Sequence, residues 1–244
     1  MLVAVAVALV VAVLVAAVVV AQRTSRRTRP TPVPVTTDGL SPVVAFLRRR
    51  PWARRTLSLL SVGLLVAAVG LLGYPFYTNL YQGRIQQRLD HQLVSPELQQ
   101  AYRDRKVGTG DALTRIRIPA IGVDVVVVEG TTASALRAGA GHYPQTPLPC
   151  EDGNVAIAGH RTTYGKPFHN LDLLKAGDDI ILETPIGECT YKVAEAPFVV
   201  LPNDTDVVQP TPTSSLTLTT CHPKGSAARR LVVRAALQGP AAPA

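Results

Sequence analysis

Aromatic residues are scarce in this sequence, at 5% of 244 residues, although hydrophobic residues as a whole reach 47%. The hydrophobic excess consists mostly of Val, Ala and Leu and lies near the N-terminus. That distribution predicts membrane helices followed by one soluble domain of ordinary size. The β-branched residues of the second half favour a sheet over helices in that domain.

Acidic residues are almost missing from residues 22–55, which hold nine arginines and the single acid Asp38. This stretch carries the whole formal excess of +8, because the rest of the chain contains 16 basic and 16 acidic side chains. A nucleic-acid-binding protein would carry its positive charge on the folded domain. The sequence therefore predicts no nucleic-acid partner, and the arginines indicate membrane topology instead.

Two hydrophobic runs flank these arginines. Leu2–Ala21 is an unbroken run of Val, Ala and Leu, long enough to cross a bilayer at about 1.5 Å per residue, and it lacks the basic start of a cleaved signal peptide. Leu57–Leu72 extends through the aromatic segment Tyr74–Tyr77, which suits a membrane interface; a buried core helix is the alternative for this run. The positive-inside rule places the arginine loop in the cytoplasm and both chain ends outside.

The expected organisation has six segments. They are a transmembrane helix (1–22), a basic, Pro-containing cytoplasmic loop (23–55), a second transmembrane helix (56–77), a helical extracytoplasmic linker (78–110), a folded domain (111–237) and a disordered tail (238–244). In the linker, Leu89, Leu93 and Leu98 recur at roughly helical spacing without a wide stripe, and Ser95-Pro96 predicts a break. We interpret the linker as a solvated spacer; a helix docked on the domain is the alternative.

The folded domain shows the alternation and turn signals of about eight short strands. The predicted strands are Leu113–Ile118, Val123–Glu129, Asn154–Gly159, Asp179–Glu183, Cys189–Val193, Phe198–Leu201, Leu216–Thr220 and Leu231–Ala236. A hairpin is expected at Pro185-Ile186-Gly187, and a short helix over 132–138 with Thr131 or Thr132 as its N-cap. Because no long helices separate the strands, we expect a mainly antiparallel, closed or nearly closed β-barrel.

Three residues suit covalent chemistry. Cys221 follows one predicted strand, His160 closes another, and Arg230 begins a third, with Arg229 as an adjacent competitor. Taken singly they are weak signals, since a free Cys is as often a small buried side chain. Together they supply a thiolate nucleophile, an imidazole that moves protons and a guanidinium that stabilises an oxyanion, which is the equipment for acyl transfer.

The motifs around these residues resemble those of the sortase family. The strings Thr217-Leu218-Thr219-Thr220-Cys221, Ala158-Gly159-His160 and Arg230-Leu231-Val232-Val233 carry the resemblance, which covers about 111–237. Longer strings, Ile118–Val123, Gly141–Pro144, Gly153–Tyr164 and Cys221–Lys224, look like the class E sortases of high-GC Gram-positive bacteria.

This resemblance implies an eight-stranded sortase barrel with short helices. It further implies Cys221 as nucleophile, His160 as general acid/base and Arg230 as oxyanion or substrate donor, and we expect Tyr143, Thr219 and Thr220 to bind substrate. The implied substrates are surface proteins with a C-terminal Leu-Pro-x-Thr-Gly or Leu-Ala-x-Thr-Gly signal, and the implied acceptor is an amine of a peptidoglycan precursor. Such an enzyme would be anchored in the bilayer with its catalytic domain outside the cell.

No metal or cofactor is expected. The acids Glu151, Asp152 and Glu188 are scattered rather than clustered as in calcium-dependent sortases, and the His and Cys residues lack a close metal-ligand spacing such as Cys-x-x-Cys. Cys150 and Cys189 remain once the nucleophile is assigned, and whether they pair stays open because pairing depends on their separation. Two other functions also stay open: a thiol hydrolase that uses water as acceptor, and a non-catalytic surface binding module.

Overall fold

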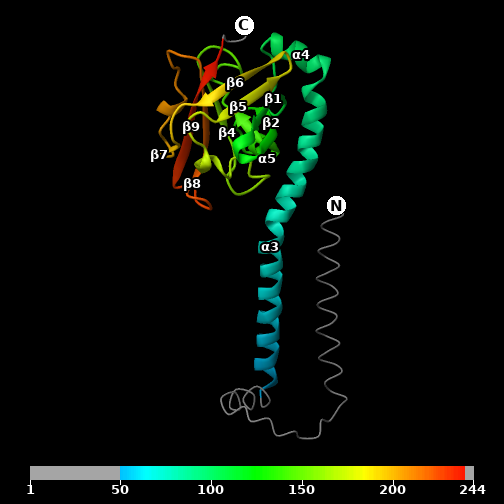
Figure 1. Cartoon of the computed structure of the whole chain (residues 1–244). Helices are drawn as coiled ribbons and strands as arrows, with labels where there is room; N and C mark the ends of the chain where they lie inside the picture. Colours follow the sequence, from blue (N-terminus) through cyan, green and yellow to red (C-terminus); the bar gives the residue numbers. More distant parts are fainter. Residues whose placement is uncertain (1–49, 240–244) are drawn as a thin grey trace. The chain divides into compact units, whose positions relative to one another are not determined.

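The computed structural model describes residues 50–239 (Figure 1). One helix in this range, α3 (Pro51–Leu93), contains a stretch long and apolar enough to cross a membrane, and no residue of that stretch is buried. The predicted second transmembrane helix, 56–77, lies within α3. The predicted first transmembrane helix, most of the arginine loop and residues 240–244 lie outside the described residues.

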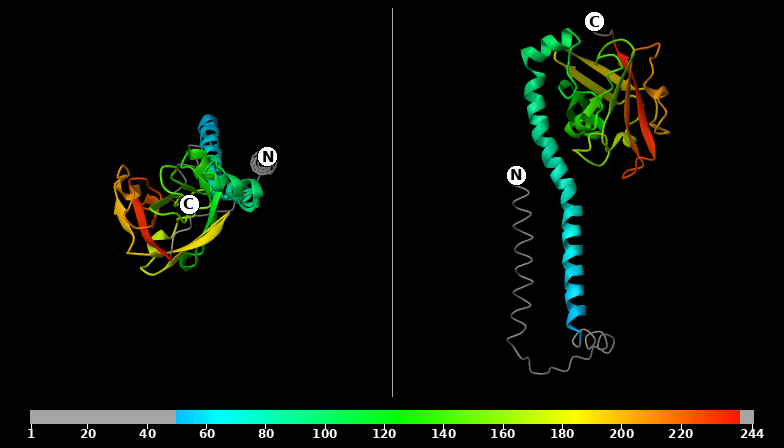
Figure 2. Two further views of the ribbon diagram at one scale, coloured as in Figure 1. Left: turned by 90° about the horizontal axis from the view of Figure 1, so that it is seen from above. Right: turned by 180° about the vertical axis from the view of Figure 1, so that it is seen from behind.

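Nine strands form one sheet (Figure 1). They are β1 (Ala112–Ile118), β2 (Val123–Glu129), β3 (Ala140–His142), β4 (Asn154–Ala158), β5 (Asp179–Thr184), β6 (Gly187–Val193), β7 (Phe198–Val200), β8 (Ser215–His222) and β9 (Arg229–Gln238). The order is β6-β5-β1-β2-β3-β4-β8-β9-β7, and β6 also pairs with β9. That extra pairing closes eight strands into a barrel, whose curved wall is visible in Figure 2, while β7 lies outside the ring on β9.

The barrel interior is the main hydrophobic core. Strand alternation turns every second side chain inward. Ile116 and Ile118 of β1, for example, are fully buried there, together with Val155 and Ile157 of β4. The core also contains Phe168 from the loop after β4. The closed, mainly antiparallel barrel expected from the sequence is thus confirmed, with parallel pairs only at β2–β3 and β4–β8.

The short elements between strands follow local sequence signals. Helix α5 (Ala133–Ala138) begins after Thr132, whose hydroxyl accepts from the Ala135 amide at 3.2 Å, so Thr132 is the N-cap. The 3₁₀ turns η1 (Pro119–Ile121), η2 (Leu171–Leu173) and η3 (Asp206–Val208) connect strands. Strand β3 was not predicted from the sequence.

The interpretation of 78–110 as a solvated spacer is wrong. The last turns of α3 and the short helix α4 (Pro96–Arg103), which begins after the predicted break, pack on the barrel wall through Leu89, Leu93 and Leu98. These leucines are at most 7% exposed and lie against the outward side chains of β1 and β2.

Glutamine side chains complete the docking of α3. The Gln86 amide bonds both the N–H and the carbonyl of Val126, at 2.7 and 3.0 Å. At the start of β1, the Gln92 amide oxygen accepts from the Ala112 backbone N–H at 3.1 Å, and its NH₂ group donates to the Asp111 carboxylate at 2.9 Å. Each glutamine hydrogen-bonds backbone groups of a strand that would otherwise bond to water. This part of the helix therefore belongs to the folded domain.

Candidate active site

Cys221 and His160 lie at the same edge of the barrel. Strand β4 ends at Ala158, two residues before His160, and it runs parallel to β8, which carries Cys221 near its end. Ala158 pairs with Thr219, and the Gly159 amide continues the ladder by donating to the Thr219 carbonyl at 3.0 Å. Because parallel strands advance together, this register brings His160 level with Cys221.

Arg230 lies directly opposite Cys221 in the antiparallel β8–β9 ladder. Opposite residues of such a pair project on the same face of the sheet, so the Cys221 and Arg230 side chains share a face. Arg230 is half-buried, and one of its terminal nitrogens donates to the carbonyls of Ala227 and Arg229 at 3.1 Å. Arg229 pairs with His222, is exposed and belongs to the opposite face.

Tyr143 contacts this same face. The Tyr143 hydroxyl lies 3.2 Å from the Thr219 hydroxyl, and the Tyr143 amide donates to the Ala156 carbonyl at 2.9 Å, which extends β3 toward β4. Thr219 is two residues before Cys221, so strand alternation places the two side chains on one side of β8. The Tyr143 hydroxyl thus reaches the side of β8 that carries Cys221, although Thr219 itself is buried.

Thr220 faces the other way. It is 2% exposed, and its hydroxyl donates to the Gly159 carbonyl at 2.7 Å. This bond holds the chain immediately before His160 against the chain immediately before Cys221. The geometry thus gives Thr220 a supporting contact inside the barrel edge, away from the face that carries Cys221.

His160 is half-buried and sits beside the ring of Tyr164, with 5.3 Å between the ring centroids. Burial lowers the pKa of His160 below its usual value, and the positive charge of Arg137 on α5 lowers it further. At neutral pH the imidazole is therefore mainly neutral, and a neutral imidazole can accept a proton. The neighbouring Gly159 is needed because a Cβ there would lie 2.5 Å from the Phe168 ring.

Sequence reasoning gave no role to Arg161, which follows His160. Arg161 is 3% exposed, and its guanidinium bonds the Cys221 carbonyl at 3.3 Å, His222 Nδ1 at 2.9 Å and the Asp172 carboxylate at 3.0 Å. Arginine side chains are usually exposed, so the sequence predicts no buried role for this one. Its position next to His160 was the one feature that could have indicated a role in the site.

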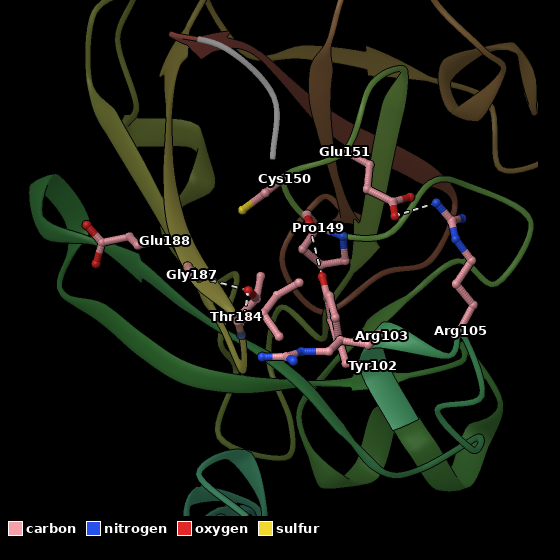
Figure 3. Close-up of a pocket in the computed structure, with 10 residues that line it drawn as sticks. Tyr102, Arg103, Arg105, Pro149, Cys150, Glu151, Thr184, Gly187 and Glu188 are labelled. Carbon is pink, nitrogen blue, oxygen red and sulfur yellow. Dashed lines mark hydrogen bonds and ion pairs between the residues drawn. The ribbon is translucent and has the colours of Figure 1, made fainter. Parts of the chain in front are cut away.

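The other end of β4 carries a separate structure. Cys150 and Cys189 form a disulfide with 5.6 Å between their Cα atoms, which leaves Cys221 as the one free cysteine of the three. Nearby, the buried Tyr102 hydroxyl donates to the Pro149 carbonyl at 2.9 Å (Figure 3). Burial raises the pKa of Tyr102.

A cavity of about 350 Å³ opens beside this disulfide (Figure 3). Its lining residues are Tyr102, Arg103, Arg105, Pro149, Cys150, Glu151, Thr184, Ile186, Gly187 and Glu188. None of the predicted site residues is among them. The cavity is at the N-terminal end of β4, whereas His160 follows its C-terminal end.

The histidines are not gathered into a zinc site: among residues 50–239 no three His, Cys, Asp or Glu side chains lie where they could hold a metal ion together. His142 instead forms a buried pair with Glu129, with 2.8 Å between Nδ1 and Oε2, and its Nε2 lies 2.9 Å from the Pro147 carbonyl. These bonds brace the loop that begins at Tyr143.

The family model for the sortase domain matches residues 116–238, half of the chain and nearly the whole barrel. The chain belongs to the sortase family. Sortases are cysteine transpeptidases, and the thiol, imidazole and guanidinium brought to one barrel edge are the groups that such chemistry uses.

Among known sortases, the chain is 33% identical over 139 residues to sortase SrtE1 of Streptomyces coelicolor, covering 51% of this chain and 40% of that protein. It is 33% identical over 131 residues to sortase D of Bacillus subtilis, covering 52% and 65%. It thus spans less than two thirds of the length of these relatives. Among solved structures, the Sortase D5 transpeptidase of Clostridium perfringens matches with a TM-score of 0.57 and 32% identity, over 65% of this chain and 98% of that one.

These comparisons confirm the sortase fold and the family resemblance inferred from the motifs, and class E sortases are among the relatives. The likeness is not confined to class E, because the class D relative is equally identical.

Proposed function

We propose that this sortase is a membrane-anchored transpeptidase that uses Cys221 as nucleophile, His160 as general acid/base and Arg230 as oxyanion donor. The observation that carries the proposal is the register of β8, which sets Cys221 opposite Arg230 on β9 and level with the end of β4 that leads into His160.

The reaction follows from the properties of these groups. His160, mainly neutral because burial lowers its pKa, accepts the thiol proton, and the Cys221 sulfur attacks the carbonyl carbon of the signal threonine. The negative charge on the carbonyl oxygen is stabilised by the Arg230 guanidinium on the same face. The Thr–Gly bond breaks, His160 returns the proton to the leaving amine, and a Cys221 thioester remains. An amine acceptor then attacks the thioester and releases the thiol.

The proposed substrates are surface proteins with a C-terminal Leu-Pro-x-Thr-Gly or Leu-Ala-x-Thr-Gly signal. Tyr143 and Thr219 favour this assignment, since their hydroxyls lie on the face of β8 that carries Cys221. The proposed acceptor is an amine of a peptidoglycan precursor. Thr220 is buried and bonded to Gly159, and its proposed role is to hold the end of β4 that precedes His160.

The proposed location is the cell membrane, with two spanning helices and the catalytic domain outside. The apolar stretch of α3 supports one anchor, and the nine arginines that precede it support a cytoplasmic loop. The chemistry agrees with this topology, because exported signals and wall precursors are met outside the cell.

Two experiments test the proposal. Peptides of the Leu-x-x-Thr-Gly type are incubated with the enzyme, with and without a primary amine, and products are identified by mass spectrometry. We expect an amide-linked product with amine; release of the free acid alone, even with excess amine, would instead establish a thiol hydrolase. Absence of any cleavage together with a slowly alkylated Cys221 would establish the binding module.

The second experiment assigns the residues. Cys221→Ala and His160→Ala should each leave less than about one per cent of activity while the protein melts as the wild type does, because each removes a group of the reaction. His142→Ala, His169→Ala and His222→Ala should retain measurable turnover. An inactive His222→Ala with an active His160→Ala would transfer the acid/base role to His222.

A further inference from the structure

Arg161 is a buried cation whose donors bond both the end of β8 and the loop that follows His160. It is 3% exposed, and a buried guanidinium is tolerated only where its N–H groups find acceptors. One terminal nitrogen bonds His222 Nδ1 and the Cys221 carbonyl, the other pairs with Asp172, and Nε donates to the His169 carbonyl at 3.4 Å.

These contacts join segments that are distant in sequence. Arg161 itself extends the chain from β4, Cys221 and His222 end β8, and Asp172 lies in η2. The adjacent residue in the chain is His160. The side chain that follows the proposed acid/base thus grips the backbone of the proposed nucleophile, across 60 residues of sequence.

The contact with His222 also fixes a tautomer. A guanidinium can only donate, so His222 Nδ1 accepts and the ring proton resides on Nε2. The nitrogen of His222 nearest Arg161 is therefore occupied. His222, the imidazole next to Cys221 in sequence, is thus a structural partner of Arg161.

We propose that Arg161 is a positioning residue that fixes the strand ends bearing His160 and Cys221 at the separation that proton transfer between them requires. The inference deepens the proposed function and rests on it for the roles of His160 and Cys221. Arginine suits the task because its planar fork directs several N–H groups at once, whereas a lysine ammonium acts as a single point charge.

The test compares Arg161→Lys and Arg161→Ala with Arg115→Lys as a matched control. Arg115 is also ion-paired, with Asp90 and with Asp124 at 2.7 Å, and its side chain is 26% exposed, but it lies on β1, away from the β4 and β8 ends. Both readouts are taken below the melting temperature of every variant: peptide turnover, and the rate at which iodoacetamide alkylates Cys221, the only free thiol.

We expect Arg161→Lys to lower kcat by about 10²-fold with KM changed less than about threefold, since small misplacements of reacting groups have losses of that order. Alkylation of Cys221 at neutral pH should slow by about tenfold, because His160 no longer takes the thiol proton efficiently. Arg115→Lys should lower the melting temperature and leave both rates within about twofold of wild type.

Wild-type kcat and alkylation in Arg161→Lys, whatever its melting temperature, would overturn the proposal and make Arg161 a structural ion pair. If Arg161→Ala does not fold, Asp172→Asn supplies a milder change, which keeps an acceptor but removes the charge that holds one side of the fork. It should give a smaller loss of kcat than Arg161→Lys, and an unchanged kcat would count against the proposal. The alkylation rates need no substrate, so they test Arg161 even if the wild-type enzyme cleaves no sorting signal and the proposed function fails.

Discussion

Gly159→Ala should damage both the stability of the domain and the placement of His160. A Cβ at this position would lie 2.5 Å from Phe168 Cδ2 and 2.9 Å from Cε2 and Cγ, distances that real Cβ atoms essentially never show. The Gly159 backbone cannot retreat, because its amide donates to Thr219 and its carbonyl accepts from Thr220. Phe168 must therefore move, and it is fully buried in the barrel core.

The expected magnitude follows from this geometry. Overpacking a well-filled core lowers the free energy of unfolding by about 1–3 kcal/mol. A domain of this size loses about 2–4 °C of melting temperature per kcal/mol, so the melting temperature should fall by roughly 2–12 °C. The Phe168 amide donates to the His160 carbonyl at 3.2 Å, so the displaced ring also moves His160, and kcat should fall by at least about tenfold.

Thermal unfolding followed by circular dichroism and peptide turnover at 25 °C measure the two effects. Gly187→Ala is the matched control, because a Cβ there meets nothing within 4 Å. Adding Phe168→Leu to Gly159→Ala should recover part of the stability, with a favourable coupling of at least about 0.5 kcal/mol in the double-mutant cycle. A Gly159→Ala protein that melts within 1 °C of wild type and turns over normally would refute the reasoning.

Three further predictions concern charge. Arg230→Ala should lower kcat by about 10²–10³-fold, as for loss of an oxyanion donor, while Arg229→Ala on the opposite face should cost far less; the reverse order in steady-state kinetics would assign the role to Arg229. Arg137→Gln should raise the pKa of His160, because it removes a like charge, and a pKa that is unchanged or lower in an NMR titration of the His160 ring would contradict the electrostatic assignment. A reporter fused at position 40 should be cytoplasmic, since moving nine arginines across the bilayer is strongly disfavoured, and protease attack on this loop in whole cells would contradict the two-helix topology.

Strand-borne features were predictable from the sequence because their signals are local. Alternation and turn residues marked eight of the nine strands and placed both Cys221 and His160 at strand ends, whereas their shared edge follows from the register of β4 and β8. Strand β3 escaped because Ala140–His142 is three residues long and owes its conformation to β2 and β4 on either side.

Features that depend on distant partners were not predictable. Gln86 and Gln92 look like solvated helix residues in sequence, yet they satisfy the backbone of two strands. The pairing of Cys150 with Cys189 required the register of β6, and the role of Arg161 required the meeting of β4 with β8. In each case the decisive contact joins residues more than 15 positions apart, where no periodic pattern operates.

The location of β9 has a consequence for how the enzyme comes into being. This strand pairs with β6, β7 and β8, and it alone joins the two ends of the ring. Because synthesis starts at the N-terminus, β9 is the last strand to be made. Until then β6 and β8 each expose an unpaired edge, to which a strand of another chain can pair. Arg230 arrives on the same strand. Barrel closure and delivery of the proposed oxyanion donor are thus one event, and a nascent chain with an exposed Cys221 thiol is not yet able to use it.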